Sequence, residues 1–238
     1  MTTRKYKPLN LLNNKGVWPE KVAIADAIKE VLTIGKCRRP LQVQDFGRYR
    51  EREWRDGDQD LVPYYSVDWY VSHAMDVQRM QVDSSRILES FTNEPWRRES
   101  MYGDHYDLFV MEEDMFDPTA PGDAPGAAYA VGKVERMKAA VISTHRIDHI
   151  WGMPYSFLKT EVMRQICFMF GVPSPGRDDV TICGHEVYCT NVCILRPART
   201  APDDWKALTE DRITKGALCD ACTSDLRAFF ELVEHEKE

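Results

Sequence analysis

The sequence has no long apolar run, no signal-like N-terminus and no surplus of positive charge. Nowhere in its 238 residues do about 18 consecutive apolar residues occur, so no membrane-spanning helix is expected. The basic N-terminus is not followed by an apolar stretch, which argues against a secretory signal and predicts a cytoplasmic location. The formal net charge of −7 gives the chain no general attraction for nucleic acid or for an anionic membrane.

Internal repeats and low-complexity tracts are also lacking. Hydrophobic residues make up 43% of the chain, enough for an ordinary core, and the length suits one large domain or one domain with a small appendage. There are seven cysteines. In a reducing compartment they indicate metal binding or free thiols rather than a disulfide framework.

Strand-like and helix-like segments alternate along the chain, which indicates an α/β or α+β fold. A helix is predicted that opens at residues 18–20 and stops at Gly35, and further helices are predicted at 84–91, 153–171 and 220–234. Strands are predicted at 41–46, 106–111, 127–132 and 139–144. The charged segment 133–138 is interpreted as a turn. Pro173 and Pro175 are expected to end the longest helix, whose predicted core face consists of Phe157, Val162, Ile166, Met169 and Phe170.

Two short cysteine pairs form the strongest local pattern. Zinc binds tetrahedral thiolate sites, and two such pairs brought together supply four ligands. We therefore predict a structural zinc ion bound by Cys189, Cys193, Cys219 and Cys222. A thioredoxin-like redox role for the second pair is disfavoured because no βαβ pattern surrounds it. The other three cysteines are expected to be small buried hydrophobes: Cys37, Cys167 and Cys183.

Read together with the segments before them, these cysteines resemble those of the archaemetzincins. That family carries the metzincin signature HExxHxxGxxH, then a cysteine pair and a CxxC. Weaker similarities occur in residues 79–88, 106–108, 131–132 and 140–146, so the resemblance spans about residues 76–227. It implies a zincin-like metzincin fold with a mixed sheet, a long former active-site helix and a C-terminal four-cysteine zinc module. The expected units are residues 1–60, 61–180 and 181–238.

The signature itself is degenerate. When the segment is aligned on Gly171, the three metal-ligand positions hold Arg164, Phe168 and Ser174, and the general-base position holds Gln165. None of the three replacements is a good zinc ligand, and a carboxamide cannot take a proton from water at neutral pH. A zinc peptidase needs a metal-activated water and a carboxylate. The sequence therefore predicts that ordinary peptidase activity is lost.

Polar side chains remain dense around the lost site. Tyr155 and His145 are candidate proton carriers, and Glu161 is a candidate for recognising a cationic substrate group. The remaining expected cleft residues are Arg164, Gln165, Asp148 and His149. His145 and His149 also have helical i, i+4 spacing, so a metal site rebuilt with His185 is an alternative to simple polar lining.

A basic segment interleaved with aromatic residues follows the first strand-like segment. Arg48, Arg50 and Arg52 are candidates for contacting the phosphates of a tRNA. Because Glu51 and Glu53 alternate with these arginines, a solvated mixed-charge loop is the alternative interpretation. Residues 112–114 form an acidic run that either receives a cationic group or lies in an exposed turn.

Three functions stay open on this basis. The first is a repurposed enzyme that forms amide bonds from aminoacyl-tRNA, giving dipeptides or cyclodipeptides, because aminolysis of an activated ester needs orientation and a proton acceptor but no metal. The second is a pseudopeptidase that binds a peptide or protein partner. The third is a metalloenzyme built on His145, His149 and His185.

Overall fold

A computed structural model describes most of the chain, and the account below concerns these residues: 7–14, 20–38, 41–48, 66–92, 105–120, 129–147, 154–183, 186–198 and 203–235. Five residues that the sequence singles out lie outside them: Arg50, Arg52, Asp148, His149 and His185. In the described part of the chain, no helix has both the length and the apolar character needed to cross a bilayer.

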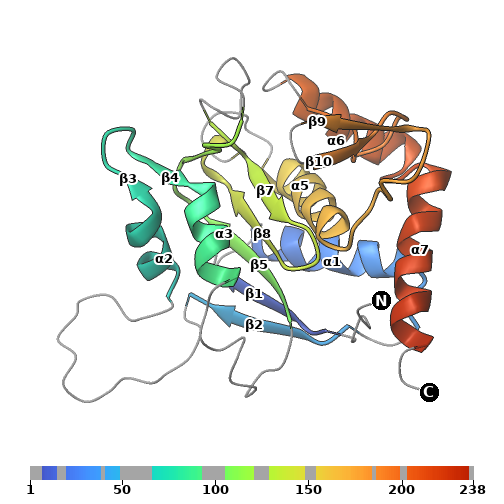
Figure 1. Ribbon diagram of the computed structural model, residues 1–238, viewed down its shortest axis with the longest axis horizontal. Coiled ribbons are helices and arrows are strands. Elements are labelled where there is room, and N and C mark those ends of the chain that lie inside the picture. Colours follow the sequence, from blue (N-terminus) through green and yellow to red (C-terminus); the bar gives the residue numbers. More distant parts are fainter. Residues whose placement is uncertain are drawn as a thin grey trace.

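A five-stranded mixed sheet forms the centre of the molecule, in the order β2-β1-β5-β8-β7 (Figure 1). Its strands are β1 (Leu9–Asn13), β2 (Val43–Gly47), β5 (Tyr106–Met111), β7 (Gly132–Glu135) and β8 (Ala139–Ser143). The first three and β8 run parallel, whereas β7 is antiparallel to β8. Every residue of β5 and β8 is buried, as expected for parallel strands covered on both faces.

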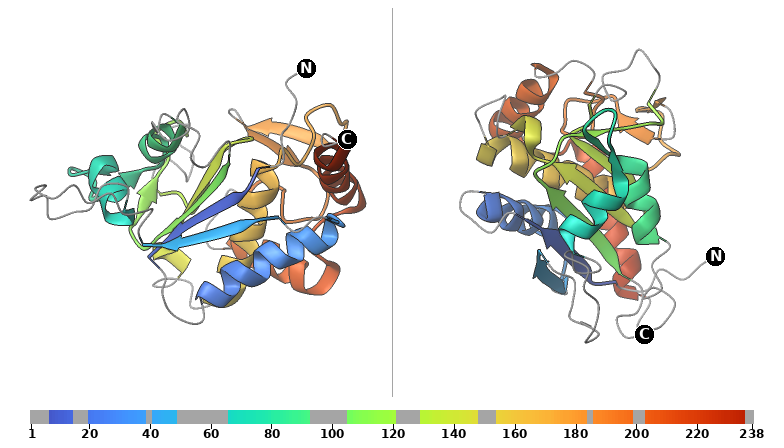
Figure 2. Two further views of the ribbon diagram at one scale, coloured as in Figure 1. Left: turned by 90° about the horizontal axis from the view of Figure 1, so that it is seen from below. Right: turned by 90° about the vertical axis from the view of Figure 1, so that its left-hand side faces the viewer.

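Helices cover both faces of this sheet (Figure 2). Helices α1 (Glu20–Ile34) and α5 (Pro154–Met169) pack together on one face, and α2 (Val67–Ala74) and α3 (Ser84–Thr92) lie on the other. The side chains of β5 alternate accordingly. Leu108 and Val110 enter the core beneath α1 and α5, and Phe109 and Met111 enter the core beneath α2 and α3.

Helix α5 carries the segment of the degenerate signature, and all five residues of its predicted core face are buried. The prediction that the prolines end it is wrong, because the helix already ends at Met169. Gly171 adopts a left-handed φ of 83°, and the Val172 N–H donates to the Cys167 carbonyl at 2.9 Å, which closes the helix in a Schellman-type turn. The predicted turn at 133–138 is also partly wrong, since its first half belongs to β7.

The C-terminal elements pack on the same core. They are β9 (Val180–Cys183), β10 (Glu186–Cys189), α6 (Asp203–Lys215) and α7 (Asp220–His235), and a small separate sheet combines β3 (Met75–Asp76), β4 (Gln81–Asp83) and β6 (Met115–Phe116). Phe229 and Phe230 of α7 pack on Phe170 with ring centroids 4.7 and 5.6 Å away. One buried cluster thus joins β1, α1, α5 and the cysteine module. The division into three units stays a prediction.

Candidate metal centre and the degenerate catalytic helix

The four predicted cysteines come together from two segments of the chain. Cys189 ends β10, Cys193 lies in the turn that follows, Cys219 directly precedes α7 and Cys222 lies in its first turn. Two backbone bonds hold these segments in place. The Cys189 N–H donates to the Leu195 carbonyl, and the Ile194 N–H donates to the Ala217 carbonyl, each at 3.0 Å.

Their sulfur atoms have the spacing that zinc requires. All four Sγ atoms lie within 4.8 Å of one another, with Cys189–Cys219 at 3.7 Å and Cys193–Cys222 at 3.9 Å. A tetrahedral zinc with Zn–S bonds of about 2.3 Å places its sulfurs about 3.8 Å apart. In the described part of the chain this is the one His/Cys/Asp/Glu group close enough to bind a metal ion. The residues therefore fit a four-thiolate zinc centre.

The remaining cysteines differ among themselves. Cys167 is fully buried on α5, and burial raises the pKa of its thiol far above the ordinary value, so it acts as an inert apolar group. Cys37 and Cys183 are only half-buried, so the expectation of burial is wrong for them.

Two metal-ligand positions of the degenerate signature hold Arg164 and Phe168. The cationic side chain of Arg164 packs on aromatic rings. Arg164 is 5% exposed, and its guanidinium lies 5.2 Å from the Phe168 ring centroid and 5.6 Å from that of Tyr188. Its Nη1 donates to the Ile194 carbonyl at 3.3 Å. Phe168 is itself buried and meets Tyr188 edge-on, with ring centroids 5.5 Å apart. This packing occupies the position of the ligands instead of leaving an open coordination site.

Gln165, at the general-base position, is hydrogen-bonded to Glu161, which lies one turn earlier on α5. The Gln165 amide donates to Glu161 Oε1 at 2.7 Å, and the Trp205 indole donates to Glu161 Oε2 at 3.3 Å. Glu161 and Gln165 are 2% and 4% exposed, and Gln165 Oε1 is buried without a hydrogen-bond partner. Both donors to Glu161 are neutral. Gly132 lies against the pair, because a Cβ there would stand 2.4 Å from each.

Glu186 and Tyr188 of β10 lie near Arg164, and the Tyr188 hydroxyl donates to the Glu186 carboxylate. Burial raises the pKa of Glu186 above its ordinary value, although this bond and the charge of Arg164 oppose the shift. Burial and the neighbouring Glu186 carboxylate also raise the pKa of Tyr188. Tyr188 and Trp205 were not anticipated from the sequence, because neither occurs in a motif.

The two proposed proton carriers have different surroundings. The Tyr155 hydroxyl donates to Asp26 Oδ2 at 2.6 Å across the α1–α5 contact, and this bond raises the pKa of the phenol. The described contacts of Glu161 are instead with Gln165 and Trp205. His145 follows β8 and lies near the Asp114 carboxylate, which Arg146 binds through two hydrogen bonds of 3.0 and 2.6 Å. The structure therefore does not bring Tyr155 to Glu161 through any described contact.

The basic segment and the acidic run are described only in part. Arg48 is exposed and binds Asp68 through two hydrogen bonds of 2.9 and 2.8 Å, so a phosphate would have to compete with this carboxylate. In the acidic run, Glu112 is exposed, whereas Glu113 is partly buried and burial raises its pKa. Asp114 is engaged by Arg146 and Gln81.

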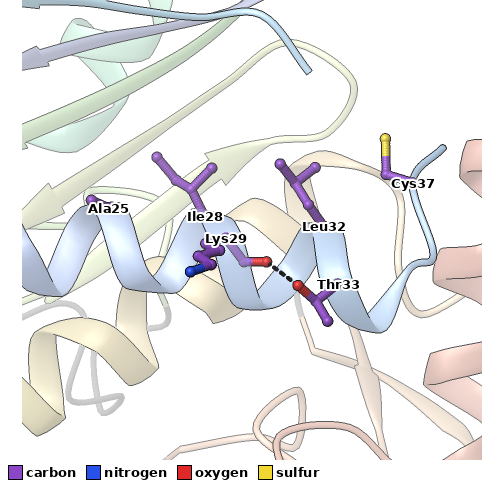
Figure 3. Close-up of a pocket in the computed structure, with 6 residues that line it drawn as sticks. All are labelled: Ala25, Ile28, Lys29, Leu32, Thr33 and Cys37. Atoms are coloured by element: carbon purple, nitrogen blue, oxygen red, sulfur yellow. Dashed lines mark hydrogen bonds between the residues drawn. The ribbon is translucent and has the colours of Figure 1, made fainter. Parts of the chain in front are cut away.

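An open pocket of about 300 Å³ lies along α1 (Figure 3). Its walls are mainly aliphatic, with one ammonium group, one hydroxyl and one thiol. The lining residues are Ala25, Ile28, Lys29, Leu32, Thr33 and Cys37. The Thr33 hydroxyl donates to the Lys29 carbonyl at 2.8 Å. None of the candidate catalytic or cleft residues lines this pocket.

Comparison with known proteins gives one informative result. No family model matches the sequence, and no curated protein matches it. Among solved structures, the chain is similar to archaemetzincin from Methanopyrus kandleri, with 16% sequence identity, a TM-score of 0.57, and coverage of 97% of this chain and 99% of that one. At this identity the likeness shows the fold alone. The chain thus has an archaemetzincin-like α/β fold with a mixed sheet and a four-cysteine cluster.

Proposed function

We propose that this protein joins amino acids by amide-bond formation and that its buried acceptor pair, Glu161 and Gln165, recognises a cationic substrate group. The observation that supports this proposal is that the pair has more hydrogen-bond acceptor atoms than donors that bond to them. Among the described residues, Glu161 receives hydrogen bonds from two neutral groups, Gln165 and Trp205, and Gln165 Oε1 receives none. A buried carboxylate is stable when a cation compensates it. A guanidinium or ammonium group of a substrate supplies both the charge and the missing donors.

The position of this pair supports a role in binding an amino acid or peptide. It lies on α5 at the degenerate signature and against Gly132 at the start of β7, the edge strand of the described sheet. Arg164, Phe168 and Ser174 occupy the metal-ligand positions, so a metal-activated water has no place there. A site that binds amino acids and does not activate water is suited to aminolysis, because hydrolysis competes poorly.

The proposed reaction is attack of an α-amine on the ester carbonyl of an aminoacyl-tRNA. A C–N bond forms, the C–O bond to the ribose breaks, the amine loses a proton and the ribose oxygen gains one. No oxidant or metal is required. Of the two candidate proton carriers, His145 suits the task better than Tyr155, because the Tyr155 phenol already donates to Asp26 and has a raised pKa. Arg48, Arg50 and Arg52 are the proposed tRNA contacts.

The test is incubation of the zinc-loaded protein with tRNA, amino acids, synthetases and ATP, followed by mass spectrometry for dipeptides and cyclodipeptides. Products should contain arginine or lysine. Glu161→Gln should reduce the yield of these products, whereas the control variant should not. Glu135→Gln is the matched control, since Glu135 is exposed on β7. No product with any donor pair, together with no tRNA binding at low salt, rejects the proposal.

A pseudopeptidase is the second candidate, favoured by the position of β7. In the described sheet β7 pairs only with β8, and an added peptide strand would pair with its other edge. Binding of unmodified peptides without any condensation product, measured by calorimetry, supports this alternative over the first.

A further inference from the structure

The cysteine centre is surrounded by hydrogen-bond donors that are unequally shared among its four sulfurs. Zn²⁺ neutralises only two of the four thiolate charges, so the sulfurs of a four-thiolate zinc site keep negative charge. An N–H group that donates a hydrogen bond to one of them lowers the electron density on that sulfur. Among the described residues, Arg177 is the one charged side chain that donates to any of these sulfurs. Its Nη1 lies 3.4 Å from Cys222 Sγ and its Nη2 lies 3.7 Å from Cys189 Sγ.

Carboxylates fix this guanidinium in place. Asp179 accepts from its Nε and Nη2 at 2.7 and 2.6 Å, and Asp225 of α7 accepts from its Nη1 at 2.7 Å. Asp225 also accepts from the backbone N–H of Ser174 at 2.8 Å. The arginine is therefore held by α7 and by the segment that follows α5, with two of its nitrogens directed at two different sulfurs.

The other two sulfurs have no contact with Arg177. Cys193 accepts hydrogen bonds from the backbone N–H groups of Leu195 and Cys219 and is fully buried. Cys219 is half-exposed, and the exposed side-chain amide of Asn191 donates to its sulfur at 3.7 Å. Cys219 is thus the ligand with the weakest donor set and the greatest access to solvent.

We propose that Arg177 is a positioning residue that keeps Cys189 and Cys222 unreactive toward electrophiles, so that Cys219 is the ligand that reacts first. With N-ethylmaleimide, the Cys219 sulfur adds to the carbon–carbon double bond, a C–S bond forms and the neighbouring carbon takes a proton from water. A zinc ion bound by the four cysteines would thereby lose one ligand. This property is independent of the proposed amide-forming activity.

The experiment measures alkylation of the zinc-loaded full-length protein by N-ethylmaleimide, with peptide mapping over time and zinc release followed by a chromogenic chelator. In the wild type, Cys219 should be modified first. In Arg177→Met, the rates at Cys189 and Cys222 should rise about tenfold, the size expected for loss of a hydrogen bond to a charged group. Zinc affinity should fall roughly tenfold to a hundredfold, as is typical when a residue that supports metal ligands is lost.

Arg136→Met is the matched control. Arg136 is also partly buried and holds the same segment through the Pro173 carbonyl at 2.7 Å, but no contact with a sulfur is described for it. Its replacement should leave the order of modification unchanged. Arg177→Lys keeps the charge but cannot reach both sulfurs with separate nitrogens, so it should restore only part of the protection. Equal changes in Arg136→Met and Arg177→Met, or unchanged site-specific rates in both Arg177 variants, overturn the proposal.

Discussion

Replacing Gly132 by alanine tests the packing of the candidate site directly. A Cβ at this position would stand 2.4 Å from both Gln165 Nε2 and Glu161 Oε1, and 2.8 Å from Gln165 Cδ. These atoms belong to side-chain ends, which move easily when they are free. Here they bond each other at 2.7 Å, and Trp205 holds the carboxylate. Relief of the clash therefore breaks a buried hydrogen bond, and we expect Gly132→Ala to reduce the free energy of unfolding by about 1–3 kcal/mol.

Gly176→Ala supplies the control for the general effect of exchanging glycine for alanine. A Cβ at Gly176 would meet no atom within 4 Å, and its backbone is not in the left-handed region. This replacement should leave stability unchanged or raise it by up to about 1 kcal/mol, because it restricts the unfolded chain.

The cost at Gly132 should also depend on the two side chains it contacts. In a Glu161→Ala/Gln165→Ala background the clash is absent, so Gly132→Ala should cost less by at least about 1 kcal/mol. Urea unfolding of zinc-saturated protein, followed by tryptophan fluorescence with the m-value held as a check, measures each step of the cycle. An unchanged cost in that background, or a cost equal to that of Gly176→Ala, refutes the described contact between β7 and α5.

Three further predictions concern the metal, the lost hydrolysis and pH. Cys219→Ser should lower the zinc content from one ion per chain to well below one and lower the melting temperature strongly, because metal binding is coupled to folding; full zinc retention by elemental analysis contradicts it. The protein should not cleave casein, and Arg164→His/Phe168→His should not restore cleavage, because Gln165 still occupies the base position; chelator-sensitive proteolysis in either protein rejects this prediction. Burial raises the pKa of Glu113 in the folded state, so its contribution is favourable at low pH and is lost as pH rises through that value. Glu113→Gln should therefore stabilise the protein more at pH 7 than at pH 4 in urea titrations, and an equal effect at both values counts against the burial argument.

The parts of the fold with strong local signals were predicted well from the sequence. Strand β5 has the predicted bounds, because a run that is apolar except for Asp107 matches a central parallel strand. The start of α3 was also predicted, since Asp83 accepts hydrogen bonds from the N–H groups of Ser85 and Arg86 and caps the helix. The convergence of the four cysteines was also predicted, because two short cysteine pairs are a sequence pattern typical of zinc sites.

Elements without such signals were missed. Strand β1 is only five residues long and begins next to a lysine–proline pair, so the basic composition of the N-terminus obscured it. Helix α6 has a mostly polar surface and few buried residues, Leu208 and Thr209 among them, which leaves a weak helical periodicity. Helix α2 was missed although its Ser66 cap follows the usual rule.

The candidate site was predicted in its positions but not in its partners. Glu161, Arg164 and Gln165 were identified because they lie at or near the degenerate signature on one helix. Trp205 approaches from α6 and Tyr188 from β10, and no local pattern relates these residues to α5. Contacts between elements far apart in the chain depend on the packing of the whole fold, which a single sequence does not specify residue by residue.

The degenerate signature and the cysteine cluster differ in how their side chains pack. On α5, Arg164 lies on the rings of Phe168 and Tyr188 and bonds a backbone carbonyl, so these side chains fill the space that metal ligands would occupy. The four cysteines lie within the buried core, and without a metal they would leave closely spaced sulfurs with no comparable packing. The carbonyl that Arg164 binds belongs to Ile194, which directly follows Cys193. The turn that carries Cys193 therefore also holds the guanidinium of Arg164 on α5, and we expect removal of a metal ion bound by the four cysteines to disturb both positions together.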